Sequence, residues 1–554
     1  MNIREIVESL VSSAAKRKAG EWGEDADLPV FLEIPRQEAH GDFSTNAAMQ
    51  IARKLGRKPR PIAEELAKAI REEDGGRRIA SLEIAGPGFI NIVLSEKAWM
   101  EVVAQALEKG DRFGESSRGA GERVHLEFVS ANPTGPLHVG HGRGAAVGDA
   151  LGRILEFTGH VVVREYYVND VGNQMDNLGR SLLARYRTEC GRPTELPEDG
   201  YRGEYMIELA REFRADHGDR YADAPAEEVL PLFRKEAGDR ILAGIREDLE
   251  TFRVRYDNWF PERELHARGE VTGAVEELRG QGLLYESEGA TFLRSQEMGD
   301  EKDRVLVRAD GRTTYFAADV AYHRHKVREG YDRLIDIWGA DHHGYVARLR
   351  AALRALGGAD SALEVLLVQF VTLVRDGKPV QMSTRSGEFT TLREVLEEVG
   401  TDAARFFYLL RSYHTHLDFD LTLAKSQERS NPVYYVQYAH ARICSIFREA
   451  EARGVTLAGN PPISILTLPD EIRLMKAVAR FPDVVSESAK SREPHRIPFY
   501  LIELADQFHK FYQNHRFLGE TPERTQARMA LARAVKTVVA TGLSLIGVTA
   551  PETM

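Results

Sequence analysis

The spacing of apolar and polar positions divides the chain into stretches of different character. Over residues 1–110, helical patterns occur in three places and are followed by one short apolar block typical of a strand. These patterns predict helices over 2–18, 47–55 and 62–71 and a strand over 88–94. Residues 108–121 are rich in Gly, Ser and charge, and they predict a linker at the end of this first domain.

Strands and helices alternate from residue 120 to about residue 375. Apolar, β-branched runs predict strands, and helical stretches separate most of them, at 124–129, 161–167, 334–338 and 365–370. Parallel strands joined by helices are buried on both faces, so this pattern predicts an α/β domain with a doubly wound, Rossmann-like parallel sheet. A mostly charged, helical insertion is expected at about 181–264.

Beyond the predicted sheet, from residue 392 onward, nearly every stretch has a helical pattern. We therefore expect a connecting segment over 376–430 and an all-α domain over 431–554. No unit repeats at a fixed period, which excludes a solenoid. A chain of 554 residues exceeds what one core supports and indicates about three or four domains.

Composition narrows the functional class. The chain has neither an apolar run of about 18 residues nor a secretory signal pattern, so we expect a cytoplasmic protein without a membrane partner. Cys190 and Cys444 are the only cysteines, which excludes a disulfide framework and a Cys-rich zinc site. The net charge of -11 repels nucleic acid overall, so any RNA contact must use local patches.

The first candidate functional site follows the first predicted strand of the sheet. Residues 127–155 contain the end of a strand, a turn rich in Pro and Gly, and then His138 and His141 at the start of a helix. The exposed N–H groups of a helix start attract phosphate oxygens, and two histidines three residues apart can reach the same phosphate chain. Gly140 and Gly142 would leave room for a base or ribose. Alternatively, these are ordinary residues at a helix start, but the strand, helix, strand order favours a nucleotide site.

The four residues 138–141 resemble the HIGH signature of class I aminoacyl-tRNA synthetases. Loop 381–387 is similar to the second signature of that family, with Gln381 and Thr384 in place of its two lysines. Lys378 and Arg385 are then the nearest cations for the departing pyrophosphate. The resemblance implies an ATP site formed by His138, Gly140, His141, Gly339, Asp341, His342, Gln381, Met382 and Ser383.

Arginine carries a planar cation with five N–H donors, so its pocket requires carboxylates. Candidates are Glu127, Ser130 and Asn132 around the first strand end, and Tyr315 with Asp319 on one helix face. Without a family resemblance, the favoured interpretation is that Glu127 is a solvated charge at the end of a strand and that Tyr315 and Asp319 belong to an ordinary helix face. In arginyl-tRNA synthetases, which the chain resembles, the matching positions bind arginine: Glu127 and Asp319 at the guanidinium, Tyr315 beside it, Asn132 at the α-amino group, and Ser130 in the same pocket.

The resemblance to arginyl-tRNA synthetases extends over the whole chain. It is carried at the N-terminus by 41–49 and 85–94, which look like the domain that touches the tRNA elbow, and later by 401–411, 431–443 and 545–554. The helical domain mixes aromatic and polar residues, as RNA-base contacts require, and we expect tRNA contacts at Tyr434, Gln437, Tyr438 and Arg442. Residues 508–517 have the same character, and core packing is the alternative use for many residues in both sets.

The resemblance implies an arginine-tRNA ligase that activates L-arginine with ATP and transfers it to tRNA(Arg). Mg²⁺ would accompany ATP, without zinc, and the protein would be a monomer that does not bind DNA. The imidazoles of His138 and His141 would stabilise the transition state at phosphorus. The resemblance also implies that arginine activation requires bound tRNA.

Two other functions are open from the residues alone. A metal-dependent phosphoesterase could use the run Asp341-His342-His343 together with Asp319, His323 and His325. A catalytically inactive, synthetase-like RNA-binding protein is suggested by Gln381 and Thr384. Intact His138 and His141 argue against the second alternative.

Overall fold

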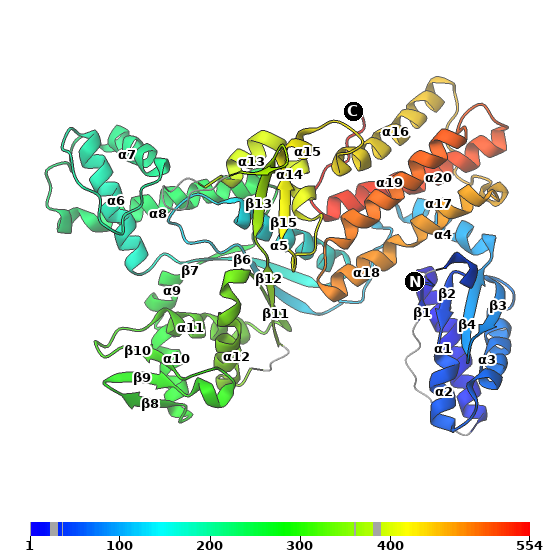
Figure 1. Cartoon of the computed structure of the whole chain (residues 1–554), viewed down its shortest axis with the longest axis horizontal. Helices are drawn as coiled ribbons and strands as arrows, with labels where there is room; N and C mark the ends of the chain where they lie inside the picture. The colour runs from blue at the N-terminus through cyan, green and yellow to red at the C-terminus, as the bar shows by residue number, and fades with distance from the viewer. Residues whose placement is uncertain (1, 23–31, 36, 359–361, 381–388) are drawn as a thin grey trace.

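The computed structural model describes residues 2–22, 32–35, 37–358, 362–380 and 389–554. Figure 1 shows an elongated molecule in which a central sheet lies between two lobes on one side and a helical domain on the other. The N-terminal domain is set apart at one end, next to the helical domain. None of the described helices is long and apolar enough to cross a membrane.

The N-terminal domain packs helices against a small antiparallel sheet. Asn2 and Glu5 form a capping box that starts the first helix at Ile3. The sheet has the order β1-β2-β4-β3. The helices are α1 (Ile3–Glu21), α2 (Ala47–Leu55) and α3 (Pro59–Asp74), and the strands are β1 (Leu32–Glu33), β2 (Phe43–Thr45), β3 (Ile79–Ala85) and β4 (Phe89–Leu94). The three expected helices and the expected strand are present, with ends shifted by up to three residues.

The central sheet is parallel throughout and has the order β12-β11-β5-β6-β7. Its strands are β5 (Arg123–Phe128), β6 (Val161–Val168), β7 (Asn258–Pro261), β11 (Arg333–Gly339) and β12 (Leu363–Val368). The predicted fold class and the four predicted strands are confirmed. Strand β7 lies inside the stretch expected to be insertion; it has four residues and only two apolar aromatics, which is too short for a recognisable pattern.

The rest of the α/β region consists of helices and a second antiparallel sheet, part of which forms lobes beside the central sheet. The helices are α5 (Val139–Phe157), α6 (Asn173–Glu189), α7 (Glu204–His217), α8 (Ala226–Thr251), α9 (Glu262–Ala267), α10 (Glu270–Gly280), α11 (Tyr315–Arg328) and α12 (Val346–Ala355). The second sheet contains β8 (Leu284–Ser287), β9 (Ala290–Leu293) and β10 (Arg304–Val307). Helices α6, α7 and α8 pack on one another and form the outlying lobe labelled in Figure 1, which agrees with the helical character expected for the insertion.

A third small sheet connects the central α/β region to the helical domain. It joins β13 (Val371–Arg375), β14 (Lys378–Pro379) and β15 (Leu417–Asp420), and α13 (Leu392–Val399), α14 (Thr401–Tyr408) and α15 (Leu421–Lys425) lie around it. Strand β15 interrupts the stretch that was expected to be helical. It forms because β13 offers a parallel partner edge, and the pairing places Phe419 in the core.

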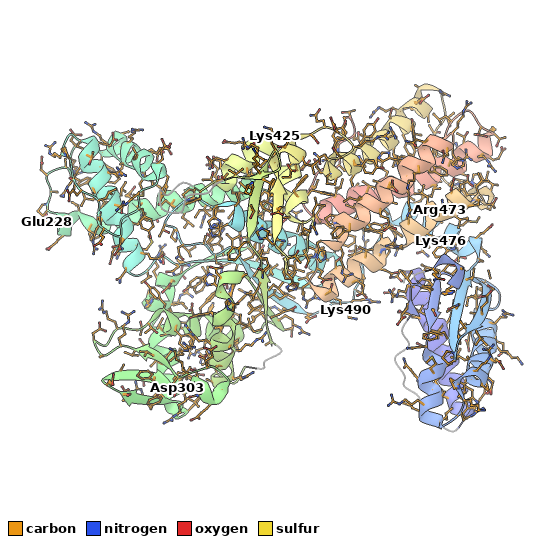
Figure 2. All side chains as sticks on the ribbon, in the orientation of Figure 1. Glu228, Asp303, Lys425, Arg473, Lys476 and Lys490 are labelled. Atoms are coloured by element: carbon orange, nitrogen blue, oxygen red, sulfur yellow. The ribbon has the colours of Figure 1, made fainter. Side chains whose placement is uncertain are left out.

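The C-terminal domain is a helical bundle, as predicted. Its helices are α16 (Pro432–Ala452), α17 (Pro469–Ala479), α18 (Phe481–Ser491), α19 (Arg496–Asn514) and α20 (Pro522–Leu545). Helix α4 (Glu96–Lys109) follows the N-terminal sheet in sequence but packs on α17 and α20. Lys476, labelled in Figure 2, extends from α17 to the N-terminal domain, where its Nζ lies 2.5 Å from Asp42 Oδ1.

Candidate functional site

A pocket of about 730 Å³ opens at the carboxyl ends of the central strands. The chain leaves β5 toward β6 on one side, and β11 returns on the other side of β5. Ligands of open α/β sheets bind where the strand order reverses in this way. The lining includes most of the predicted site residues: Glu127, Ser130, Asn132, His138, Gly140, His141, Tyr315, Asp319, Gly339, Asp341 and His342.

The backbone is strained where it enters the pocket. Val129 and Ser130 have φ values of 68° and 39°, a region that a β-branched residue such as Val rarely adopts. Neighbouring groups hold this turn in place, since Tyr167 N–H donates to Ser130 Oγ (3.1 Å) and Tyr166 Oη–H donates to Ala131 O (2.8 Å). The strain directs the chain out of the sheet, so that the following turn lines the pocket.

The two signature histidines form an ordered pair at the start of α5. The His138 ring accepts hydrogen bonds at Nδ1 from Gly140 N–H (3.0 Å) and His141 N–H (3.4 Å), and His141 Nδ1 accepts from His138 N–H (3.3 Å). The rings stack with centroids 3.7 Å apart. Because each Nδ1 is an acceptor, each neutral ring carries its hydrogen on Nε2.

Both imidazoles are neutral at physiological pH. Burial, together with a smaller contribution from the adjacent His138, lowers the pKa of His141 to about 3. Burial also lowers the pKa of His138, although Asp341 opposes that effect. The pair therefore offers two neutral Nε2–H donors, which can bind phosphate oxygens without carrying a positive charge.

This geometry changes two expectations about the helix start. The N–H groups of Gly140 and His141, expected to be open to a phosphate, already donate to His138, so the donors that remain are imidazole groups. Gly142 is buried, and a Cβ there would lie 2.7 Å from Tyr408 Oη, so this glycine permits helix packing and leaves no bare surface for a base. A Cβ on Gly144 would meet no atom within 4 Å, and this glycine lines the pocket instead.

The side of the pocket lined by Tyr315 and Asp319 is acidic. Tyr315 and Asp319 share one face of α11, as predicted, and Tyr345 Oη–H donates to Asp319 Oδ2. Burial raises the pKa of Asp319 to about 6, despite the lowering effect of that hydrogen bond. Burial and the charge of Asp319 together raise the pKa of Glu262, a buried residue of α9, to about 7. Among the described residues, no Lys or Arg forms an ion pair with either carboxylate, and the basic group nearest to Glu262 is His266, whose Nε2 lies 3.5 Å from Oε1. A cationic ligand would therefore stabilise both.

Glu262 was not among the sequence candidates. It follows β7, which was hidden in the predicted insertion, and its neighbours come from distant parts of the chain. In the amide orientation that satisfies its surroundings, Asn169 donates to Glu262 Oε2 (2.9 Å). Only the pairing of β7 with β6 places this glutamate near the pocket wall.

Glu127 has a different environment from Asp319. The sheet register aligns Asp336, Glu127 and Glu165 on three adjacent strands, all of them buried. Lys326 Nζ lies 2.5 Å from Glu127 Oε2 and 3.0 Å from Asp336 Oδ1. The charge of Glu127 is therefore compensated inside the protein, and the geometry favours Asp319 as the carboxylate that a guanidinium would approach.

The remaining carboxylate of this row is also satisfied. Burial would raise the pKa of Glu165, but hydrogen bonding and charge from His125 lower it to about 2. Tyr322 and Asn258 also donate to this carboxylate. The row fastens α11 to the sheet and so fixes the position of Asp319.

Asp341 and His342 are exposed at the pocket edge on η4 (Ala340–Tyr345), a 3₁₀ helix that follows β11. His323 also lines the pocket, but its ring nitrogens are engaged by Asp319 O (2.9 Å) and Asp336 Oδ2 (2.9 Å). Across the described ranges, no group of three or more His, Cys, Asp or Glu side chains is placed to hold a metal ion. The residues suggested for a phosphoesterase are thus not gathered into one ligand set.

The second signature loop falls outside the described residues, and with it Gln381, Met382, Ser383 and Arg385. Its flanks are described. Lys378 is exposed on β14 and does not line the pocket. After the loop, Phe389 lines the pocket and Leu392 N–H donates to Leu137 O (2.7 Å), which attaches this end of the loop to the histidine turn.

A larger cleft of about 1090 Å³ lies alongside, between α7, α8 and α13. It shares Phe389 with the smaller pocket, and its lining contains the acidic residues Glu204, Glu208, Glu212, Glu247, Asp248, Glu394 and Glu397. It contains neither of the paired histidines. The smaller pocket is the candidate active site because the chemically suited groups converge there.

The predicted RNA contacts on α16 divide into two groups. Tyr434 and Tyr438 are partly exposed and stack at 6.0 Å, and the Arg442 guanidinium lies 4.5 Å from the ring centroids of both Tyr438 and Tyr512. Gln437 is buried, and its amide donates to Asp402 Oδ2 (2.8 Å) and Thr549 O (3.0 Å). The first group forms an aromatic surface, whereas Gln437 connects α16 to α14 and the C-terminal segment.

Models of three known families match successive parts of the chain. The arginyl tRNA synthetase N-terminal domain model matches residues 1–94, and the DALR anticodon-binding domain model matches 436–554. The catalytic domain model of class I (R) tRNA synthetases matches 102–199 and 233–408. The unmatched residues 200–232 lie within the predicted insertion.

Similar proteins cover the whole length. An arginine-tRNA ligase of Syntrophotalea carbinolica is 52% identical over 527 residues, 95% of each chain, and one of Thioalkalivibrio sulfidiphilus is 47% identical over the full length of both. The arginyl-tRNA synthetase structure from Campylobacter jejuni has a TM-score of 0.77 at 37% identity and covers 83% of this chain and 100% of its own. That from Thermus thermophilus, at 24% identity, shares the fold over the full length of both chains, with a TM-score of 0.78. The chain belongs to the arginyl-tRNA synthetase family.

Proposed function

We propose that this chain, an arginine-tRNA ligase by its family, carries out both steps of that reaction in the 730 Å³ pocket. First, an oxygen of the arginine carboxylate attacks the α-phosphorus of ATP, and the bond to pyrophosphate breaks. Then a ribose hydroxyl at the 3′ end of tRNA attacks the arginyl carbonyl carbon and displaces AMP. The observation that carries the proposal is that imidazole donors and an uncompensated carboxylate open onto one pocket.

ATP would bind on the side of α5, with Gly140, Gly339, Asp341 and His342 around it. The Nε2–H groups of His138 and His141 would donate to phosphate oxygens whose charge grows as the α-phosphorus becomes five-coordinate. Preorganised donors are effective at this position because they do not need to reorient during the reaction. The His138 and His141 rings can donate hydrogen bonds while neutral, because cations would neutralise the negative charge of the phosphate chain.

Those cations are proposed to be Lys378, Arg385 and a magnesium ion that arrives with ATP. A divalent metal is part of the family's chemistry and would supply charge neutralisation on the phosphate oxygens. The proposal assigns this ion to ATP rather than to a dedicated protein site, and it includes no zinc. Gln381, Met382 and Ser383 remain proposed contacts to ATP.

Arginine would bind with its guanidinium toward Asp319 and with Tyr315 beside it. Glu262 adds a second negative charge behind the wall formed by Tyr167 and Asn169. Ser130 and Asn132 would hold the α-amino end, close to the histidine turn. Glu127 is proposed to act indirectly, since its charge is balanced by Lys326.

For tRNA, we propose that Tyr434, Tyr438 and Arg442 form a stacking surface for bases, while Gln437 maintains the domain junction. The N-terminal domain would touch the tRNA elbow, and the protein would act as a cytoplasmic monomer that does not bind DNA. The phosphoesterase and inactive-protein alternatives are not favoured by the comparisons.

ATP-pyrophosphate exchange, followed with each amino acid in turn and with or without tRNA, tests the proposal. We expect exchange with arginine alone among the amino acids. Exchange that is fastest with another amino acid would refute it, and so would a protein that charges tRNA with none of them. A comparison of the reactions with and without tRNA also tests the tRNA requirement implied by the family.

A further inference from the structure

Asp319 does not present two equivalent oxygens to the pocket. Its Oδ2 accepts a hydrogen bond from the hydroxyl of Tyr345, and no hydrogen bond within the described residues involves its Oδ1. Tyr345 is the last residue of η4, the segment that carries Asp341 and His342. One hydrogen bond thus joins α11, which carries Asp319, to η4, which lines the side of the pocket proposed to bind ATP.

Tyr345 is held rigidly by its neighbours. The Arg348 guanidinium lies 4.6 Å from the centroid of its ring, and Trp338 and Phe316 meet the ring edge to face at 6.1 Å and 6.2 Å. Burial and the charge of Asp319 raise the pKa of Tyr345 above its ordinary value, so the hydroxyl keeps its proton and acts as the donor. Since the ring cannot move freely, its hydroxyl defines the orientation of the carboxylate.

We infer that Tyr345 is a positioning residue for arginine recognition: it occupies Oδ2 of Asp319 and directs Oδ1 toward the guanidinium. This inference rests on the proposed function and deepens it. Glu262 has a comparable arrangement, in which the Asn169 amide donates to Oε2. Each carboxylate is therefore oriented by a neutral donor, which leaves its charge available to a cationic ligand.

The charged groups around Asp319 explain why the Tyr345 hydroxyl affects the ionisation of this carboxylate. Glu262 and Glu127 are like charges, whereas Lys326 and His323 are the basic groups near it, and Tyr167 faces the same acidic region. The Tyr345 hydrogen bond favours the ionised form of Asp319. Without it, the carboxylate would be free to rotate and would hold its proton up to a higher pH, and both effects weaken binding of a cation.

The test is Tyr345→Phe, which deletes one hydroxyl and keeps the ring. We expect KM for arginine to rise about tenfold, as the loss of a hydrogen bond to a charged group predicts. KM for ATP should change by less than about twofold. The acidic limb of the pH profile of kcat/KM for arginine should move to higher pH, because the pKa of Asp319 rises.

Tyr186→Phe is the matched control, since its buried hydroxyl donates to Gly218 O (2.8 Å) in the insertion, remote from the pocket. It should leave both KM values and the pH profile unchanged. A structural role alone would lower thermal stability and kcat in Tyr345→Phe without moving the acidic limb. That outcome, or kinetics identical to the unmodified protein, would overturn the inference.

A second measurement guards against a folding defect. In an Asp319→Asn background, Tyr345→Phe should no longer affect arginine binding, because the group it orients is already changed. An undiminished effect of Tyr345→Phe in that background would contradict the inference. If the unmodified protein fails to charge arginine, the proposed function is wrong; if it charges arginine and Tyr345→Phe behaves normally, only the positioning role is wrong.

Discussion

Carboxylates that are removed from solvent have different partners in the pocket and at the junction between α5, α14 and the C-terminal segment. At the junction, Asp149 pairs with Arg405 and Arg153. Burial would raise the pKa of Asp402, yet hydrogen bonds from Thr549 and Arg253 hold it below its ordinary value. In the pocket, burial raises the pKa of Asp319 to about 6 and that of Glu262 to about 7.

The difference separates structural charges from ligand-binding charges. A protein gains nothing in stability from a desolvated, ionised carboxylate that no Lys or Arg pairs with, so such a group in a pocket indicates that a ligand supplies the cation. In a family that activates arginine, the natural source of that cation is the guanidinium of the substrate. The paired carboxylates of the junction instead hold the signature helix α5 against the helical domain.

Breaking a junction pair should have the largest effect. Asp149→Asn leaves the fully buried guanidinium of Arg405 without its ion pair, which should lower the free energy of unfolding by about 3 to 5 kcal/mol. Urea denaturation measures this change. An exposed pair offers the control: Asp239→Asn removes the partner of Lys235 and should leave the free energy of unfolding nearly unchanged. Equal effects of the two variants would remove the distinction between buried and exposed pairs.

The imidazole donors should rank next. His141→Ala should slow pyrophosphate exchange about 100- to 1000-fold, the usual effect of removing one transition-state donor. The exposed His414 serves as a control, and His414→Ala should retain exchange. Near-normal exchange in His141→Ala would exclude this ring from the chemistry.

Asp319→Asn tests the pocket side of the comparison. It should reduce kcat/KM for arginine about 100-fold, as expected when a charge-assisted contact to a ligand is lost. The variant should be as stable as the unmodified protein or more stable at pH 8, because ionised Asp319 destabilises the empty pocket. This gain should be complete above pH 6 and fade as pH falls toward the ordinary pKa of a carboxyl. A loss of stability at pH 8 would show that Asp319 is a structural charge.

The pH dependence of kcat/KM for arginine tests whether the pocket carboxylates bind the substrate cation. Asp319 and Glu262 must be ionised to attract a cation, and their pKa values lie at about 6 and about 7. We expect kcat/KM for arginine to fall as pH decreases below 7, by about tenfold for each pH unit once one carboxylate is mostly protonated. KM for ATP, measured in parallel, should be less affected. A constant kcat/KM between pH 8 and pH 5.5 would contradict the assignment.

The smallest effect is expected on α16. Tyr438→Leu should raise KM for tRNA about tenfold, within the range for loss of one stacked base. Gln437→Leu should mainly destabilise the junction with Asp402 and Thr549, with little change in that KM. The reverse result would reassign the RNA surface to Gln437.

Much of the fold was predictable from the sequence because long patterns are local. The four strands of the central sheet, the helix that carries Tyr315 and Asp319, and the helical C-terminal domain all have clear apolar spacing. Strand β7 escaped prediction because four residues carry too little pattern. Strand β15 was also missed, since it depends on an edge that β13 provides from elsewhere in the chain.

The sequence by itself determined the chemical groups of this protein: the paired histidines at a helix start, the tyrosine and carboxylate one helical turn apart, and the alternation that builds a parallel sheet. Only the tertiary structure decided which charges are compensated. It placed Lys326 against Glu127, Tyr345 against Asp319, and Glu262 near the pocket. The physical reason is that helix and strand patterns depend on near neighbours, whereas the ionisation of a buried group depends on partners brought together by folding.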